Sequence, residues 1–313
     1  MTESAVPPTE RARFAVAGAR ANVAAALGSQ PRGDVIRNNL FAGLLLLAIL
    51  IALAGLVALL AQAFAEGAPA LSTKLITEPP STIDTANAGF RPALIGSVVM
   101  ILFVIGLIVP LGVGAAVYLE EYADGTKWWN RVIELNIQNL AAVPSIIYGI
   151  LGLGLIVRGP LDLGFVLFAG AMTLALLVLP IVIIAGREAI RAVPPSIREG
   201  SLALGATQWQ TIRRQVLPAA IPGVATGVIL AVSRALGETA PLLLVGATVF
   251  VTADPTPFDG NYSALPVQIF QYATRPQEEF QTLAAAGIIL MLVVLIAMNS
   301  VAIWLRNRYE QKW

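Results

Sequence analysis

The chain has 313 residues, of which 57% are hydrophobic and only 12% are charged, and its mean hydropathy is +0.77. Soluble domains carry roughly 25% charged residues, so this composition excludes an ordinary soluble domain. The formal net charge of +1 offers no basic field for nucleic acid. With no Cys and no His, the sequence also excludes a disulfide, a Cys/His metal site, a thiol nucleophile and a histidine base.

Six segments are long and apolar enough to cross a membrane as helices, which takes roughly 20 residues for about 30 Å of hydrocarbon. In chain order they are residues 40–65, 93–119, 137–157, 163–186, 222–251 and 282–305. Only the fifth contains charged residues, Arg234 and Glu238. The sequence therefore predicts an all-α, polytopic membrane protein with six transmembrane helices.

The distribution of Lys and Arg predicts the orientation, because cytoplasmic segments of membrane proteins carry an excess of both. With the N-terminus inside, fifteen of these residues are cytoplasmic and four are outside. Both termini are therefore expected in the cytoplasm. The predicted parts are a cytoplasmic tail at 1–39, a first transmembrane helix with its outer loop at 40–92, a five-helix core at 93–305 and a cytoplasmic C-terminal tail at 306–313.

The predicted cytoplasmic loop at residues 187–218 has the pattern of two short helices joined by a glycine. Ser196 and Glu199 have the spacing of a capping box that would start the first helix. Gly205 can end it in the left-handed conformation, and the second helix carries Trp209. Such a knob suits insertion into a groove on a partner protein. An ordinary loop lying on the lipid headgroups is the alternative.

The charged pair in the fifth span is the candidate substrate site. Arg234 lies twelve residues past Pro222, about 18 Å at 1.5 Å per residue, which predicts a position near the middle of the bilayer. An Arg there costs roughly 2.5–3.5 kcal/mol and should face the protein interior or a water-filled path. Glu238, four residues on, can form an ion pair with it. We interpret Arg234 as a hydrogen-bond donor to an oxyanion. Glu238 would hold Arg234 when the site is empty, and the Thr239 hydroxyl would add a hydrogen bond to the ion. A purely structural ion pair is the alternative.

Two smaller features complete the pattern. Pro144 interrupts the third span, and Ser145 beside it is a further candidate for lining the path. Glu120, Glu121 and Asp124 form an acidic cluster after the second span, which we interpret as a solvated loop.

The loop at 187–218 resembles a known docking element. Glu199-Gly200-Ser201, then Gly205, then Leu217-Pro218 resemble in spacing the cytoplasmic loop by which permeases of ABC importers dock on their ATPase subunits. Gly200 and Ser201 replace two alanines of that pattern, and Gln215 replaces an isoleucine. The resemblance implies that the residues coupling this chain to an ATPase are Glu199, Gly205, Trp209, Leu217 and Pro218.

ATP chemistry is expected on another polypeptide. No glycine-rich phosphate loop ending in Gly-Lys-Ser or Gly-Lys-Thr occurs in the sequence. We therefore expect a transport subunit, not an enzyme, that binds no cofactor or metal itself, with ATP and Mg²⁺ at the partner ATPase.

Residues 234–243, Arg-Ala-Leu-Gly-Glu-Thr-Ala-Pro-Leu-Leu, resemble the signature of the phosphate-specific transport permeases, and the last four are closer to PstA-type than to PstC-type subunits. Runs at 118–122, 143–149 and 265–270 support the resemblance, which covers residues 93–313. Members of this family often place an Arg near the inner end of the fourth span, where this chain has no charge before Arg187.

This resemblance implies the type I ABC importer permease fold, with two short cytoplasmic coupling helices and an extra first helix around a five-helix core. It also implies the partners: a homologous PstC-type permease, two PstB-type ATPase subunits and a PstS-type phosphate-binding protein, in the lipid of the bacterial cytoplasmic membrane. Inorganic phosphate is then the expected substrate.

Two other functions stay open. A related permease could import another oxyanion or a small solute, since only the fifth-span signature indicates phosphate. A membrane scaffold or sensor could use the same knob to recruit a signalling partner without transporting anything.

Overall fold

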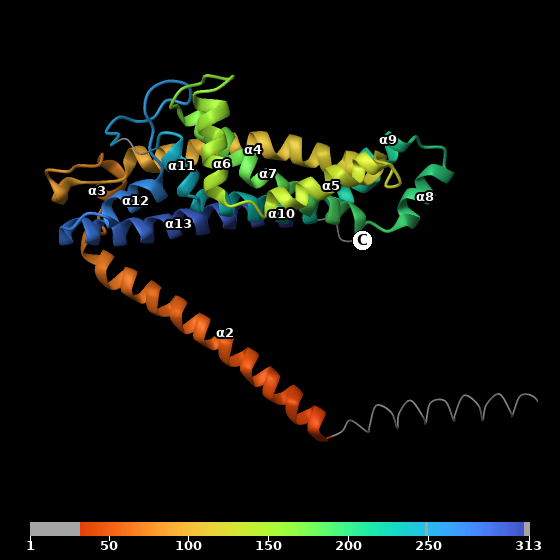
Figure 1. Cartoon of the computed structure of the whole chain (residues 1–313), viewed down its shortest axis with the longest axis horizontal. Helices are drawn as coiled ribbons and strands as arrows, with labels where there is room; N and C mark the ends of the chain where they lie inside the picture. The colour runs from red at the N-terminus through yellow and green to blue at the C-terminus, as the bar shows by residue number, and fades with distance from the viewer. Residues whose placement is uncertain (1–31, 248–249, 310–313) are drawn as a thin grey trace, which may run out of the picture. The chain divides into compact units, whose positions relative to one another are not determined.

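The computed structural model describes residues 32–247 and 250–309, and their secondary structure is helical (Figure 1). The chain divides into two compact units, residues 1–62 and 63–313. Described residues of the first unit belong to α2 (Arg32–Gly67), in which apolar residues lie on all sides of the helix. Residues 1–31 of the predicted N-terminal tail and residues 310–313 of the predicted C-terminal tail lie outside the described residues.

Among the described residues, five helical segments are long and apolar enough to span a membrane: Ile36–Ala70, Arg91–Tyr122, Leu167–Arg191, Gln208–Gly237 and Glu278–Arg308. They confirm the first, second, fourth and sixth predicted spans, with shifted ends. A sixth span is present if the bent pair of α5 (Trp128–Ala141) and α6 (Ser145–Leu151, continued by η4, Gly152–Val157) counts as one.

The third span is broken rather than straight, so the predicted interruption at Pro144 is a complete break between two helices, and α5 begins at Trp128 instead of the predicted residue 137. α5 and the helix that starts at Ser145 meet at an angle of 107°. Pro144 stands at the break in an extended conformation, with ψ of 137°. Proline has no N–H to continue the helical hydrogen bonds, and it disfavours the helical conformation of the residue before it.

The fifth span also ends earlier than predicted. α10 (Leu217–Gly237) stops at Gly237, and a five-residue helix, α11 (Ala240–Leu244), follows instead of a continuation to residue 251. Pro241 explains the stop, because its ring would clash with the carbonyl of the residue four positions earlier, which is Gly237. The break is complete, because Glu238 and Thr239 belong to neither α10 nor α11.

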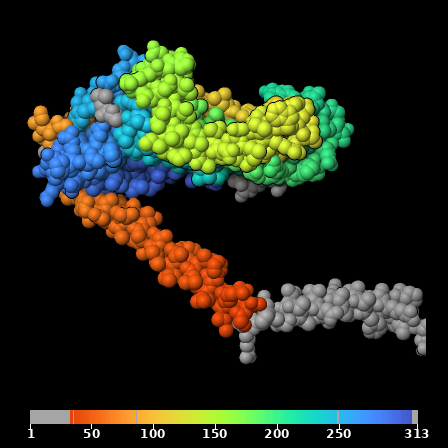
Figure 2. All heavy atoms as spheres, in the orientation of Figure 1, coloured from red at the N-terminus to blue at the C-terminus, as the bar shows by residue number. Residues whose placement is uncertain are grey.

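The core of the second unit consists of α4 (Arg91–Val117), α7 (Leu167–Arg191) and α10, which pack against one another along their lengths. Small residues allow this close approach. A Cβ added at Gly112 would lie 2.7 Å from Val182 Cγ1, and one at Gly186 would lie 2.9 Å from Ala116 Cβ. The glycines therefore fix the spacing of α4 and α7. Figure 2 shows α5 and α6, in yellow and light green, covering part of one face of this unit.

One end of this bundle carries the predicted knob, which consists of α8 (Pro195–Ala203), α9 (Gln208–Thr211) and η5 (Ile212–Val216). Gly205 has φ of +82°, and the amides of residues 205 and 206 bond back to Leu202 and Ser201, which is the Schellman ending of a helix. The predicted cap at Ser196 is wrong, because α8 begins one residue earlier at Pro195, a favoured first helical residue.

The opposite end is closed by loops that carry η1 (Ala68–Ala70), α3 (Lys74–Thr77), η2 (Thr85–Asn87) and α12 (Leu265–Ala273). α12 lies in a segment predicted to be an outer loop, yet residues 262–269 are buried. The amide of Leu265 donates to Ser97 Oγ of α4 at 2.8 Å. α12 packs along α13 (Glu278–Tyr309), so this segment folds back into the bundle.

Candidate substrate site and coupling surface

Arg234 and Glu238 form the predicted ion pair at the break after α10. Nε of Arg234 lies 3.1 Å from Oε1 of Glu238, with 42% and 17% of the two side chains exposed. Arg234 stands in the last turn of α10, where the free carbonyls of a helix end favour a positive charge. Glu238 is the first residue outside the helix, with an extended ψ of 123°. The break therefore brings the carboxylate back over the guanidinium.

Helix packing gives the level of Arg234 within the bundle. A Cβ at Gly223 would lie 2.6 Å from Ala189 Cβ, and one at Gly227 would meet Ala185 Cβ, so α10 and α7 run antiparallel in a fixed register. Seven residues further along α10, the same register places Arg234 opposite Val178. That residue lies near the middle of α7 (Leu167–Arg191), so Arg234 stands halfway along the bundle.

Contacts with α13 also indicate where Arg234 lies along the bundle. Ser233 Oγ donates to Asn299 Oδ1 at 2.7 Å, and Arg306 Nη1 donates to Thr226 Oγ1 at 3.2 Å. Both contacts follow one antiparallel register, in which Arg234 lies beside the C-terminal half of α13. Two neighbouring helices thus place the charged pair well inside the length of the spans.

Arg234 belongs to an exposed stripe of α10. The stripe consists of Gly223, Thr226, Leu230, Arg234 and Gly237, spaced three or four residues apart, and all five are exposed. Residues at this spacing lie on one face of a helix. Gly223 on this face approaches Ala189 of α7, and Thr226 accepts a hydrogen bond from Arg306 of α13, but Leu230, Arg234 and Gly237 stay exposed. The part of the face around Arg234 is therefore available to a solute path or to another membrane protein.

α6 lies against α11, the short helix that follows Glu238 and Thr239. A Cβ at Gly149 would lie 2.7 Å from Pro241 Cα. The Tyr148 hydroxyl donates to the Leu140 carbonyl at 2.8 Å across the break between α5 and α6. Tyr148 was missed in the sequence. The proline break three to four residues before it is the signal that could have indicated it.

The two hydroxyl residues predicted for the path are present nearby but form no bond to the charged pair. Ser145 is the half-buried first residue of α6, and Thr239 is the half-buried residue before α11. In the described parts of the chain, neither side chain is hydrogen-bonded to Arg234 or Glu238. Their role as path residues stays a prediction.

The knob presents exposed apolar side chains together with Glu199. Leu204 is 91% exposed, and Leu202 and Trp209 are also exposed. Glu199 is exposed on α8, and Gly205 forms the bend between α8 and α9. An exposed apolar group of this kind marks a surface for a partner.

Leu217 and Pro218, the other two predicted coupling residues, are not on the exposed surface of the knob. They are half-buried at the start of α10, and Leu217 packs against an apolar cluster that includes Ile190, Ile212 and Val216. They therefore connect the knob to the bundle.

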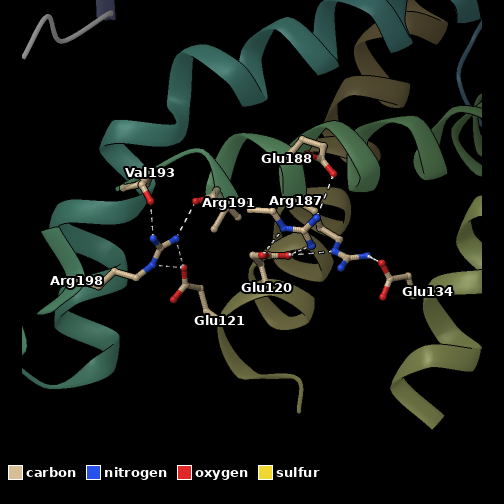
Figure 3. A network of polar contacts seen from close by, with 9 residues as sticks. Glu120, Glu121, Glu134, Arg187, Glu188, Arg191, Val193 and Arg198 are labelled. Carbon is tan, nitrogen blue, oxygen red and sulfur yellow. Dashed lines mark hydrogen bonds and ion pairs between the residues drawn. The ribbon is translucent and has the colours of Figure 1, made fainter. Parts of the chain in front are cut away.

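Beneath the knob lies a network of charged side chains at the end of α4 (Figure 3). It starts from Glu120 and Glu121 in η3, the turn that continues α4 at Tyr118–Tyr122. Glu120 accepts from Arg191 Nε at 2.9 Å and lies 3.4 Å from Arg187 Nε, and both arginines are on α7. Arg187 also pairs with Glu134 of α5 at 2.9 Å.

These contacts correct the interpretation of Glu120 and Glu121 as a solvated cluster, since only 15% and 10% of their side chains are exposed. Asp124 differs from them because it is exposed, and the hydrogen bonds from Thr126 lower the pKa of its carboxyl group.

Comparison with known proteins agrees with this architecture. Residues 108–312 match the family model described as "Binding-protein-dependent transport system inner membrane component". The phosphate transport system permease protein PstA of Yersinia pestis is 35% identical over 268 residues, 85% of this chain and 88% of that protein. PstA 1 of Mycobacterium tuberculosis strain H37Rv is 41% identical over 217 residues, 68% of each chain.

Two solved structures share the fold. A structure of the MetNI methionine ABC transporter in inward-facing conformations gives a TM-score of 0.55 at 18% identity, covering 70% of this chain and 94% of that one. A bacterial ABC transporter involved in the import of the acidic polysaccharide alginate gives a TM-score of 0.57 at 16% identity, covering 89% and 98%. The fold is that of the type I ABC importer permeases, and the chain belongs to the family of binding-protein-dependent transport system inner membrane components, in the branch of the PstA permease proteins.

Proposed function

We propose that this chain is the membrane permease subunit of an ATP-driven ABC importer that carries inorganic phosphate inward across the bacterial cytoplasmic membrane. The PstA relatives support the substrate, since they are named for phosphate transport. The observation that carries the proposal is the Arg234–Glu238 pair, which lies at a helix break halfway along the bundle on the exposed stripe of α10. Intramembrane charges of this kind mark substrate pathways by default.

The chemistry of the pair suits a small oxyanion. Glu238 is bonded to Nε of Arg234, which leaves the two terminal nitrogens of the guanidinium to donate to phosphate oxygens. The hydroxyl groups of Thr239 and Ser145 would add hydrogen bonds if they turn toward the bound ion. Glu238 competes with phosphate for Arg234 and so keeps the affinity low enough for release. Broken helices of this type form substrate sites in many transporters.

The remaining surfaces fit the subunits of such an importer. The exposed stripe of α10 would face a homologous PstC-type permease, with the phosphate path between the two. The knob would dock on one of two PstB-type ATPase subunits through Glu199, Trp209 and the bend at Gly205, with ATP and Mg²⁺ bound there. Leu217 and Pro218 would transmit its position to α10.

The excess of Lys and Arg around the knob supports a cytoplasmic position for this end and for both termini. A PstS-type phosphate-binding protein would then deliver its ligand at the opposite end. ATP binding would close the ATPase subunits and move the knob, which opens the path outward. Phosphate would displace Glu238 from Arg234, and hydrolysis would return the inward-open state.

ATP-driven uptake of labelled phosphate by the reconstituted complex tests the substrate. We expect uptake that persists in excess sulfate. If sulfate abolishes it, the permease carries another oxyanion. If no ATPase co-purifies with the chain, the scaffold or sensor function is favoured and the proposal fails.

The competitor role of Glu238 has its own test. A Glu238→Gln variant removes the negative charge but keeps the size of the side chain. We expect slower turnover with tighter phosphate retention, because Arg234 then loses its internal partner. Unchanged turnover would contradict the role of Glu238.

A further inference from the structure

Arg198 of the knob is bound to two different parts of the bundle, the end of α4 and the end of α7 (Figure 3). Its Nε and Nη2 donate to Oε1 of Glu121 at 3.0 and 2.8 Å. Its Nη1 donates to the Val193 carbonyl at 2.6 Å, and Nη2 also donates to the Ile190 carbonyl at 2.8 Å. One guanidinium therefore joins α8, the end of α4 and the end of α7. Only 22% of the Arg198 side chain and 10% of the Glu121 side chain are exposed.

Glu121 holds the second half of the knob as well. Its backbone carbonyl accepts a hydrogen bond from Gln208 Nε2 of α9 at 2.7 Å. Inside the knob, the hydroxyls of Ser201 and Thr211 are 2.9 Å apart and link α8 to the end of α9. Glu121 is thus the residue of the α4 end that contacts both helices of the knob.

Polar contacts dominate the attachment of α8. No residue of α8 is buried, and Ile197 only packs partly against the apolar cluster at this end. Charge-assisted hydrogen bonds in partly buried positions are stronger than neutral ones, and removing one partner leaves the other charge without compensation. The position of α8 relative to α4 and α7 therefore depends on Arg198 and Glu121.

The other half of the knob is attached differently. α9, η5 and α10 form one continuous helical run from Gln208 to Gly237, which leads directly to Arg234. Without Arg198, the knob would keep this run, the Gln208 bond to the Glu121 carbonyl and the short chain link from α7, but α8 would lose its charge-assisted contacts with the bundle. With Arg198 bound, a displacement of α8 also reaches the ends of α4 and α7.

We propose that Arg198 and Glu121 form a joint that makes the α8–α9 knob and the ends of α4 and α7 move as one body. The joint ensures that a motion imposed on the knob by a partner is transmitted to three core helices together. The two residues are positioning residues for energy coupling and do not touch the transported ion. The identity of the driving partner rests on the proposed function, whereas the rigid connection rests on the contacts alone.

Distance measurements test the rigid connection without using transport. The chain has no cysteine, so spin labels can be placed at Ala203→Cys, an exposed position of α8, and at Gly114→Cys in α4, where a Cβ meets nothing within 4 Å. In the assembled complex we expect one narrow distance that is the same without nucleotide and with ATP bound. In Arg198→Gln the distance should broaden or shift between the two states. A nucleotide-dependent distance in the parent chain, or no effect of Arg198→Gln, would overturn the joint.

The second readout is the amount of substrate carried per ATP hydrolysed. Loss of the charge-assisted hydrogen bonds of Arg198 should weaken the attachment of α8 by about a factor of ten or more. We therefore expect Arg198→Gln to lower the amount of substrate carried per ATP about tenfold, while ATP hydrolysis continues. Arg198→Lys keeps the charge but not the forked geometry, so its ratio should lie between those of the parent and of Arg198→Gln. Arg308→Gln, an exposed arginine at the end of α13, is the matched control and should keep the parent ratio.

The outcomes separate the two proposals. If the parent complex carries no phosphate but the distances behave as expected, the proposed function fails and the joint stands. If phosphate is carried and the ratio in Arg198→Gln equals that of the parent, the joint fails and the proposed function stands.

Discussion

The contact between α6 and α11 beside the charged pair should be very sensitive to one methyl group. A Cβ at Gly149 would lie 2.7 Å from Pro241 Cα, 2.9 Å from Leu244 Cδ1 and 3.1 Å from the Pro241 carbonyl oxygen. Carbon atoms in ordinary contact are about 3.5–4.0 Å apart, so Gly149→Ala requires α6 and α11 to separate by about 1 Å. The obstacle is mainly backbone, which cannot turn away as a side chain can.

Overpacking of this kind costs typically about 1–3 kcal/mol. For a unit of this size, 1 kcal/mol lowers the melting temperature by roughly 2–4 °C. Gly149→Ala should therefore lower the melting temperature of the purified protein in detergent by several degrees. Because α11 follows Glu238 and Thr239 directly, the same separation should reduce phosphate uptake in the assembled complex.

Gly154→Ala is the control for this prediction. Gly154 lies in the same helical segment as Gly149, but a Cβ there meets nothing within 4 Å. It should be neutral, or slightly stabilising because Ala favours helix over Gly. Equal melting temperatures and uptake in the two variants would refute the argument from the contact between α6 and α11.

Three further predictions concern other parts of the chain. Thr207 and Gln210 form a capping box at the start of α9, so Thr207→Ala should cost about 1 kcal/mol and speed amide exchange in α9, while exchange in α4 stays unchanged. Leu204 is 91% exposed on the knob, so Leu204→Ser should leave the melting temperature within about 1 °C but reduce the amount of ATPase that co-purifies; equal recovery would exclude Leu204 from the docking surface. Burial raises the pKa of Tyr272 to about 12, so its neutral form contributes stability that is complete below about pH 10 and is lost as the pH rises through about 12. Tyr272→Phe keeps the ring beside Phe90 and Phe280 and should show a smaller drop in melting temperature between about pH 9 and pH 12 than the parent; an equal drop would contradict this assignment.

The helices that follow from sequence are those set by long apolar runs. α2, α4, α7 and α13 were predictable because their apolar runs are long; Pro110 in α4 and Pro180 in α7 do not end these helices, and the helix ends shift by a few residues. In the sequence, Pro144 and Pro241 indicate that a helix can be disturbed at these positions, but not that it ends there. A proline in a span can produce a kink or a complete stop, and neighbouring groups decide which, such as the Leu140 carbonyl bonded by Tyr148.

The Arg234–Glu238 pair and the contacts of Glu120 and Glu121 differ in how far they could be predicted from the sequence. The Arg234–Glu238 pair was predictable because its members are four residues apart in the chain. The partners of Glu120 and Glu121 lie 71 and 77 residues away, on α7 and α8, and local spacing carries no information about such contacts. The burial of these glutamates follows only from the packing of α4 against α7.

The central claim is that Arg234 contacts the transported phosphate, and uptake of labelled phosphate by the Arg234→Gln complex tests it most directly. The variant should be compared with the parent and with Arg308→Gln at equal assembly of the complex. We predict that Arg234→Gln abolishes uptake while Arg308→Gln retains it. Normal uptake by a fully assembled Arg234→Gln complex would contradict the account.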